Sequence, residues 1–127
     1  MLDTSVLIAG LAPKMIETIE EYCSSAICRA ELARGLWVAE KDPAQHLQTN
    51  ARRELLRLLD AIPGFWLDFD RAAADGYAQL ATDALRREDA LIAGHAISRG
   101  LTLITADRSF TRFPGLSLEV AGAGDAA

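Results

Sequence analysis

The sequence predicts an α/β fold of three layers, in which a central, mostly parallel sheet of four to five strands lies between two layers of helices. Short apolar segments of strand length alternate with longer segments whose apolar residues recur at helical spacing, which is typical of a parallel sheet covered on both faces. The 127 residues contain no internal repeat, low-complexity block or linker, which indicates a single domain over residues 1–127.

Five short apolar segments are the predicted strands. They occupy residues 1–3, 24–28, 65–69, 101–104 and 116–120. The first is unusually short for an opening strand, and the third alternates large apolar residues in the way of a half-buried strand.

Six helices are predicted between these strands. They occupy residues 5–11, 15–22, 29–40, 42–62, 71–87 and 88–99. Asp42 and Pro43 suit the first positions of the longest helix, and Asp70 suits the cap of the helix that follows the third strand. The last two helices meet without a turn residue, so either loop residues are missing between Arg87 and Glu88 or the loop is deleted in this chain.

Apolar spacing on the longest helix predicts which of its residues face the core. The predicted inner stripe consists of Leu47, Leu55, Leu58, Leu59 and Ile62. On the preceding helix Trp37 lies off the apolar stripe, so it is expected either to be partly exposed and to dock a partner helix or to belong to the core.

Composition limits the classes of protein to consider. Half of the residues are hydrophobic and about a quarter are charged, which is ordinary for a globular protein. No apolar run approaches the ~18 residues of a membrane span, and no basic segment precedes the first apolar stretch, so we expect a cytoplasmic protein without a signal peptide. The two cysteines, Cys23 and Cys28, are expected to be free thiols.

The net charge of −5 argues against a broad basic surface for nucleic acid, although it leaves room for a local basic patch. The basic residues are nearly all arginines, which suit bidentate contacts to phosphate.

Four carboxylates stand at strand ends or helix starts. They are Asp3, Glu31, Asp89 and Asp107. In an open parallel sheet, ligands bind in the crevice at the carboxyl ends of the strands. Carboxylates gathered there repel one another unless a cation or a proton lies among them, and an all-oxygen set of ligands favours Mg²⁺ or Mn²⁺. Taken singly, each acid is better explained as a helix cap or a surface carboxylate, and only the four together favour a site.

Three further polar residues accompany these acids. Ser5 and Thr105 can hydrogen-bond the carboxylates, or they can be ordinary cap and strand-end hydroxyls. His95 follows Asp89 by six residues, so on a helix it points away from that carboxylate, and we expect it to have a structural role.

The spacing of the four acids resembles that of PIN-domain ribonucleases, and most closely the VapC toxins of prokaryotic toxin–antitoxin modules. The residues that carry the resemblance are Asp3-Thr4-Ser5, Glu31-Leu32-x-x-Gly35, Asp89-Ala90-Leu91-Ile92-Ala93 and Thr105-Ala106-Asp107-x-x-Phe110. The resemblance covers nearly the whole chain. It departs from the family in the few residues before Asp3 and in the lack of a glycine-containing loop where Arg87 meets Glu88.

The resemblance implies a PIN-like fold and endonucleolytic cleavage of RNA that depends on Mg²⁺ or Mn²⁺. It implies that Asp3 and Asp89 bind the metal directly, that Asp107 completes the shell or binds a second ion, and that Glu31 orients the water or binds through water. It also implies a cognate small antitoxin, which docks on the N-terminal helices and inserts a basic side chain among the acids, and a homodimer. The expected RNA contacts, which otherwise form a solvated charged face, are Arg86, Arg87, Arg108 and Arg112.

Three other classes of protein are alternatives to this interpretation. A haloacid-dehalogenase-type phosphatase needs a second aspartate where Ser5 stands, and a phosphoacceptor receiver needs a late lysine, whereas Lys14 and Lys41 are both early. A non-catalytic, partner-binding PIN-like domain is the third alternative. The presence of all four acids argues against it, because an unused cluster would only add repulsion.

Overall fold

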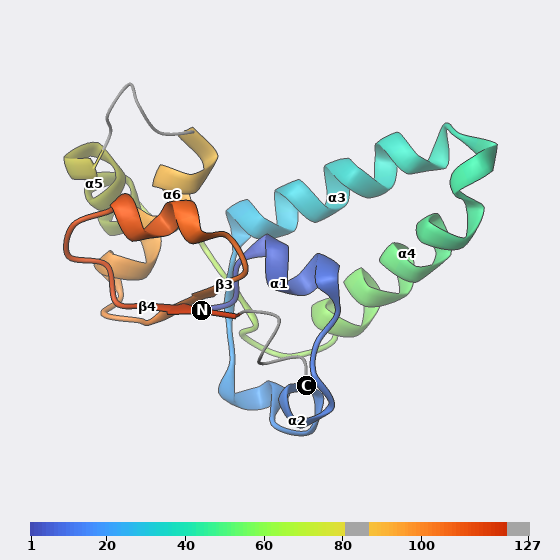
Figure 1. The fold of residues 1–127 in the computed structure, drawn as a ribbon, viewed down its shortest axis with the longest axis horizontal. Helices are drawn as coiled ribbons and strands as arrows, with labels where there is room; N and C mark the ends of the chain where they lie inside the picture. The colour runs from blue at the N-terminus through green and yellow to red at the C-terminus, as the bar shows by residue number, and fades with distance from the viewer. Residues whose placement is uncertain (81–86, 122–127) are drawn as a thin grey trace.

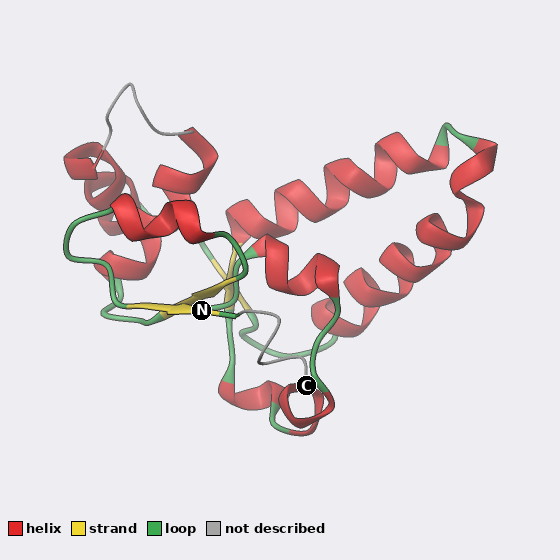
Figure 2. Cartoon of the chain, in the orientation of Figure 1, coloured by secondary structure: helices red, strands yellow, loops and turns green. Residues whose placement is uncertain are grey.

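Helices surround a short parallel sheet in the computed structural model, which describes residues 1–80 and 87–121 (Figures 1 and 2). Strand β1 (Ser24–Ser25) pairs with β2 (Trp66–Leu67), and β3 (Leu103–Thr105) pairs with β4 (Leu118–Val120), in both cases in parallel. Leu2 joins the two pairs, since it forms parallel bridges to β1 and to β3. The order across the sheet is therefore β2, β1, Leu2, β3, β4, which confirms the predicted mostly parallel sheet.

The central strand is reduced to about one residue but is firmly held on both sides. The Leu2 amide donates to the Cys23 carbonyl at 2.7 Å, and the Asp3 amide donates to the Ile104 carbonyl at 2.9 Å. The Ser24 hydroxyl donates to the Leu2 carbonyl at 2.6 Å. These bonds fix where Asp3 leaves the sheet.

Two hydrophobic cores lie on opposite faces of this sheet. Met1 and Leu103 belong to one core, whereas Leu2 and Ile104, their neighbours in the chain, pack into the other. Because successive residues of a strand point to opposite faces, the two cores are separated by the sheet. The predicted three-layer α/β/α arrangement follows from this alternation.

The helices divide between the two faces. Their bounds are α1 (Thr4–Ala9), α2 (Pro13–Glu17), α3 (Ala26–Glu40), α4 (His46–Asp60), α5 (Arg71–Leu80) and α6 (Arg87–Ser98), with 3₁₀ turns at Ile19–Glu21, Pro43–Gln45 and Arg108–Arg112. Buried residues of α5 and α6 fill the core that contains Met1, and buried residues of α1, α3 and α4 fill the core that contains Leu2. None of the helices in the described ranges is long and apolar enough to cross a membrane.

Helices α3 and α4 form a long hairpin that projects away from the sheet (Figure 1). Asp42 caps its turn, since its Oδ1 accepts from the Ala44 amide at 3.0 Å. The predicted inner stripe of α4 is partly wrong, because Leu47 is 82% exposed and Leu58 is 58% exposed. Beyond the sheet each helix of the hairpin has only the other to pack against, so α4 buries a narrower stripe than its apolar spacing suggests.

Two predicted boundaries also differ from the structure. The strand predicted over residues 24–28 ends at Ser25, because the Ser25 hydroxyl accepts from the Ile27 amide at 3.1 Å and so begins α3 at Ala26. Arg87 and Glu88 both lie in the first turn of α6, so the chain is helical where the two predicted helices meet. The end of the helix predicted over residues 71–87 falls partly on residues 81–86, which lie outside the described ranges.

Candidate acidic site

The strand order creates a reversal at the centre of the sheet. Counted along the chain, the five extended segments lie in the spatial order 3-2-1-4-5, so the order reverses between Leu2 and β3. Ligands of open α/β sheets bind outside the carboxyl ends of the strands at such a reversal. Asp3 directly follows Leu2, and Thr105 is the last residue of β3, so both lie at this point.

Asp3 is held by two hydroxyl groups. It is 4% exposed, and its Oδ2 accepts from Ser5 Oγ and from Thr105 Oγ1, each at 2.7 Å. Asp3 is also the N-cap residue of α1, but its side chain makes no capping hydrogen bond. The Asp3 carboxylate therefore does not cap α1 but points toward the end of β3.

Two backbone amides orient these hydroxyls. The Ala106 amide donates to Ser5 Oγ, and the Asp107 amide donates to Thr105 Oγ1, both at 3.0 Å. Because each hydroxyl oxygen already accepts a hydrogen bond from a backbone amide, its own O–H group can donate to Asp3. Both hydroxyls donate to Oδ2, so neither occupies Oδ1.

Asp107 is tied to the same network through its backbone. Its side chain caps the 3₁₀ turn that follows, since Oδ1 accepts from the Ser109 amide at 2.9 Å. The amide of Asp107 and the carboxylate of Asp3 thus share one hydroxyl, that of Thr105.

Glu31 approaches from α3. It is half-buried, and its Oε1 accepts from Thr4 Oγ1 at 2.8 Å. Burial raises the pKa of Glu31, and the charges of Asp3, Asp89 and Glu88 raise it further against the opposing hydrogen bond from Thr4. Asp3, which precedes α1, and Asp89, on α6, are therefore both close enough to Glu31 on α3 for their charges to act on it.

The predicted acids differ in how closely the structure brings them together. Within residues 1–80 and 87–121, no three histidine, cysteine or acidic side chains already stand in a metal-binding arrangement. The donor chemistry still fits a hard divalent cation, because all the candidate ligands are oxygens and because the charges of Asp3 and Asp89 add to the rise that burial causes in the pKa of Glu31. The residues that would hold such an ion are Asp3, Glu31, Asp89 and Asp107.

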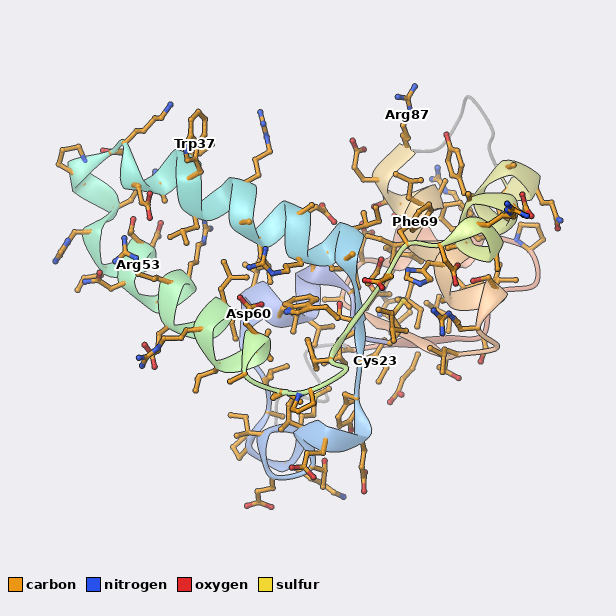
Figure 3. All side chains as sticks on the ribbon, turned by 180° about the vertical axis from the view of Figure 1, so that it is seen from behind. Cys23, Trp37, Arg53, Asp60, Phe69 and Arg87 are labelled. Carbon is orange, nitrogen blue, oxygen red and sulfur yellow. The ribbon has the colours of Figure 1, made fainter. Side chains whose placement is uncertain are left out.

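The predicted arginines flank the acids. Arg87, two residues before Asp89, projects outward from the start of α6 (Figure 3). Arg108 and Arg112 are exposed on the 3₁₀ turn after Asp107. Arg86 lies outside the described residues.

Sequence reasoning missed the role of Thr4. Its hydroxyl suits a helix cap, but in the structure it binds Glu31, which is 27 positions away in the chain. Nothing local in the sequence announces this contact, because it depends on how α3 crosses α1.

The cysteines are free thiols, as predicted. Cys23 is half-buried and Cys28 is fully buried beneath the acids. Burial raises the pKa of Cys28 to about 11, and the charges of Asp3 and Glu31 contribute to the rise. The thiol is therefore protonated at neutral pH.

Comparison with known proteins agrees with this geometry. The family model described as "PIN domain" matches residues 1–116, so the chain belongs to the PIN-domain family. Among its curated relatives is the "tRNA(fMet)-specific endonuclease VapC" of Salmonella typhimurium, which is 32% identical over 94% of this chain and 95% of its own length. The chain is thus a VapC-type member of the family.

Solved structures give the same result. The crystal structure of DNA-bound VapBC from Salmonella typhimurium contains a chain with a TM-score of 0.69 and 29% identity, over 94% of this chain and 96% of that one. A chain of VapBC-5 from Mycobacterium tuberculosis, of the VapBC family of toxin–antitoxin systems, gives a TM-score of 0.70 and 28% identity, with 96% of each chain covered.

Proposed function

We propose that this protein is a Mg²⁺- or Mn²⁺-dependent endoribonuclease that acts as the toxin of a type II toxin–antitoxin system. The single observation that carries the proposal is the gathering of Asp3, Glu31 and Asp89 in one electrostatic field at the strand reversal. Membership of the PIN-domain family and the endonuclease activity named for the curated relatives support it.

Each acid has a distinct proposed role. Asp3 and Asp89 bind the divalent cation directly, and Asp107 completes the shell or binds a second ion. A divalent cation in this position polarises the scissile phosphate and acidifies a nearby water. Ser5 and Thr105 keep Asp3 in place by donating to Oδ2, which leaves Oδ1 for the ion.

Glu31 is proposed to orient the attacking water and to accept its proton. A carboxyl group whose pKa is raised toward the working pH is a better base than an ordinary exposed glutamate. The hydrogen bond from Thr4 holds one of its oxygens, Oε1, and so fixes the direction in which the carboxylate points.

The proposed substrate is RNA, which the exposed arginines around the acids would hold by its phosphates. Arg87, Arg108 and Arg112 stand beside Asp89 and Asp107 in the chain, and Arg86 is proposed to join them. A local arginine patch is compatible with the net charge of −5.

A small antitoxin is the proposed protein partner, as in the VapBC structures that this chain resembles. The α3–α4 hairpin offers exposed apolar side chains for docking, among them Trp37, Val38 and Leu47. Trp37 projects from the outer side of α3 (Figure 3), with the Lys41 ammonium 3.3 Å from the centroid of its ring system. A homodimer and a cytoplasmic location belong to the same proposal.

Cleavage of RNA by purified protein tests the proposed function. Asp3→Asn and Asp89→Asn are each expected to reduce the cleavage rate by roughly 100-fold or more, because metal ligation contributes several kcal/mol to the transition state. Chelation should abolish cleavage, and added Mg²⁺ or Mn²⁺ should restore it. Glu54→Gln, which removes an exposed carboxylate on α4, is the matched control and should cleave normally. Unchanged rates in both aspartate variants would contradict the proposal.

A further inference from the structure

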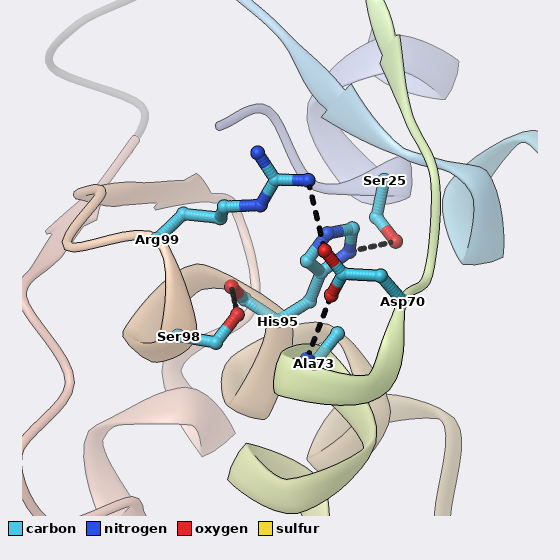
Figure 4. Close-up of polar contacts among 6 residues, drawn as sticks. All are labelled: Ser25, Asp70, Ala73, His95, Ser98 and Arg99. Carbon is cyan, nitrogen blue, oxygen red and sulfur yellow. Dashed lines mark hydrogen bonds and ion pairs between the residues drawn. The ribbon is translucent and has the colours of Figure 1, made fainter.

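His95 is buried in the interior behind the acids and is bonded to a different helix. Its side chain is 0% exposed, and its Nδ1 lies 2.8 Å from Ser25 Oγ (Figure 4). Ser25 is the last residue of β1 and the N-cap of α3, where its hydroxyl accepts from the Ile27 amide. The bond between His95 and Ser25 therefore fastens α6 directly to the beginning of α3.

Each of the two segments connected at this joint also leads to or carries one of the acids. Glu31 follows Ser25 on α3 by six residues, and Asp89 precedes His95 on α6 by six residues. The charge of Asp89 contributes to the raised pKa of Glu31, so the spacing of the two carboxylates depends on how α3 and α6 are held together. A change at the joint would be transmitted to the acids by two rigid helices.

The surroundings of His95 show what the imidazole provides. The ring of Phe69 meets it edge-on, with centroids 5.4 Å apart. The nearby charged groups are Asp70, which caps α5 through the Ala73 amide, and Arg99, whose guanidinium lies 3.3 Å from the Asp70 carboxylate (Figure 4). Burial lowers the pKa of His95, and Arg99 lowers it further against the opposing charge of Asp70, so the ring is neutral at pH 7.

The second ring nitrogen of His95, Nε2, shows that burying a histidine at this position has a cost. Among the described residues, Nε2 is buried without a hydrogen-bond partner. Leaving such a group unpaired destabilises the folded state, a cost that an apolar side chain would avoid. The Ser25 hydroxyl accepts from a backbone amide, so its own proton is available to Nδ1, and this bond is what an apolar residue could not supply.

We propose that His95 is a positioning residue, which sets the spacing of Glu31 and Asp89 through its hydrogen bond to Ser25 and so tunes the affinity of the acidic site for a divalent cation. The inference rests on the proposed function, in which these acids bind Mg²⁺ or Mn²⁺.

Two substitutions distinguish the effect of the hydrogen bond between Nδ1 and Ser25 from the effect of the size of the imidazole ring. His95→Asn keeps a polar atom near the position of Nδ1, whereas His95→Gln moves its amide to the position of Nε2, out of reach of Ser25. In calorimetric titration with Mn²⁺ alone, His95→Gln should bind at least about tenfold more weakly, the usual effect of losing an outer-shell partner. His95→Asn should stay within about twofold of the wild type. The rate of RNA cleavage should fall in the same order, with kcat changing more than KM.

Stability controls distinguish positioning from a general loss of folding. Leu59→Ala opens a cavity on α4 and should lower the melting temperature without changing the Mn²⁺ affinity. Should His95→Gln not fold, Ser25→Ala removes the other partner and is expected to weaken Mn²⁺ binding to a similar degree.

The inference is overturned if His95→Gln or Ser25→Ala is folded and binds Mn²⁺ as tightly as the wild type. It is also overturned if Leu59→Ala loses as much affinity as the joint variants do. A wild-type protein that neither binds Mn²⁺ nor cleaves RNA would instead contradict the proposed function, and the inference with it.

Discussion

Asp3 stands at the start of a helix, but its side chain does not cap that helix. An aspartate at a helix start normally accepts from the free amides of the first turn. Here its carboxylate accepts from the hydroxyls of Ser5 and Thr105, and the backbone of Ala106 and Asp107 orients those hydroxyls. The first turn of α1 therefore has no side-chain cap from Asp3. The two hydroxyls instead hold the buried Asp3 carboxylate in one direction.

Glu31 links the electrostatics of the site to the stability of the protein. Its pKa is raised above the ordinary value of 4.5, so the folded protein binds this proton more tightly than the unfolded chain does. Stability is therefore lost as the pH rises from the ordinary pKa through the raised one, because the unfolded chain releases the proton first.

Glu31→Gln tests this linkage. Glutamine can still accept from Thr4 through its side-chain carbonyl, but it carries no charge. Without divalent ions, the variant should melt at a higher temperature than the wild type at pH 7, and the difference should shrink at pH 4. Thermal melts at the two pH values measure the effect, with Glu20→Gln as a control on an exposed carboxylate. A wild type that melts higher than Glu31→Gln at pH 7 would show that the repulsion is absent.

The residues of the site differ in how well the sequence predicts them. Ser5 and Thr105 are foreseeable as neighbours of Asp3, because both lie within two residues of a predicted acid. The contacts of Thr4 with Glu31 and of His95 with Ser25 are not, since they join residues 27 and 70 positions apart. Such contacts depend on how helices cross, which apolar periodicity does not encode.

At the scale of elements, the closest helix contact is made by two glycines. Gly76 on α5 and Gly94 on α6 face each other, and a Cβ placed on Gly94 would lie 2.4 Å from the Tyr77 amide nitrogen. A Cβ on Gly76 would lie equally close to the Gly94 carbonyl oxygen. Only glycine permits this approach, which brings α5 against the helix that carries Asp89 and His95.

Gly94→Ala should therefore push α5 and α6 apart. We expect a loss of about 1–3 kcal/mol in the free energy of unfolding, the usual effect of overpacking, despite the higher helix propensity of alanine. Urea denaturation measures it. Gly35→Ala is the matched control, since its Cβ would meet only the guanidinium end of the long Arg52 side chain, at 3.3 Å, and its stability should change by less than about 1 kcal/mol. Equal effects of the two substitutions would contradict the close crossing.

The errors of prediction at this scale have two physical causes. The strands are only two or three residues long, so apolar residues 26–28, which read as strand, belong to a helix that Ser25 begins. Leu47 and Leu58 have the spacing of core residues but are exposed, because apolar periodicity does not tell a face that packs inside the chain from one that faces away from it.

At the scale of the whole molecule, the sheet explains why acids from distant segments meet. The fold class is predictable because strands and helices alternate regularly, and the crevice follows from the parallel order. The strand order itself, with Leu2 between β1 and β3, cannot be predicted from any local sequence pattern. Placing Leu2 at the centre brings Asp3 beside Thr105, the last residue of β3, which precedes Asp107 by two residues.

The arrangement of cores supports the same conclusion. The two cores lie on opposite faces, one under α5 and α6 and the other under α1, α3 and α4. Asp89 lies on α6, which packs into the first core, and Glu31 lies on α3, which contributes Leu32 to the second core and Cys28 to the first. A cation bound by both carboxylates would join α6 to α3.

The most direct test of this account is the anomalous scattering of a crystal of the protein grown or soaked with Mn²⁺. We expect a peak among the carboxylates of Asp3, Glu31, Asp89 and Asp107, with at least Asp3 and Asp89 as direct ligands. A peak confined to other carboxylates, such as Glu40 and Asp42 at the turn of the hairpin, or no peak at the strand reversal at saturating Mn²⁺, would contradict the central claim.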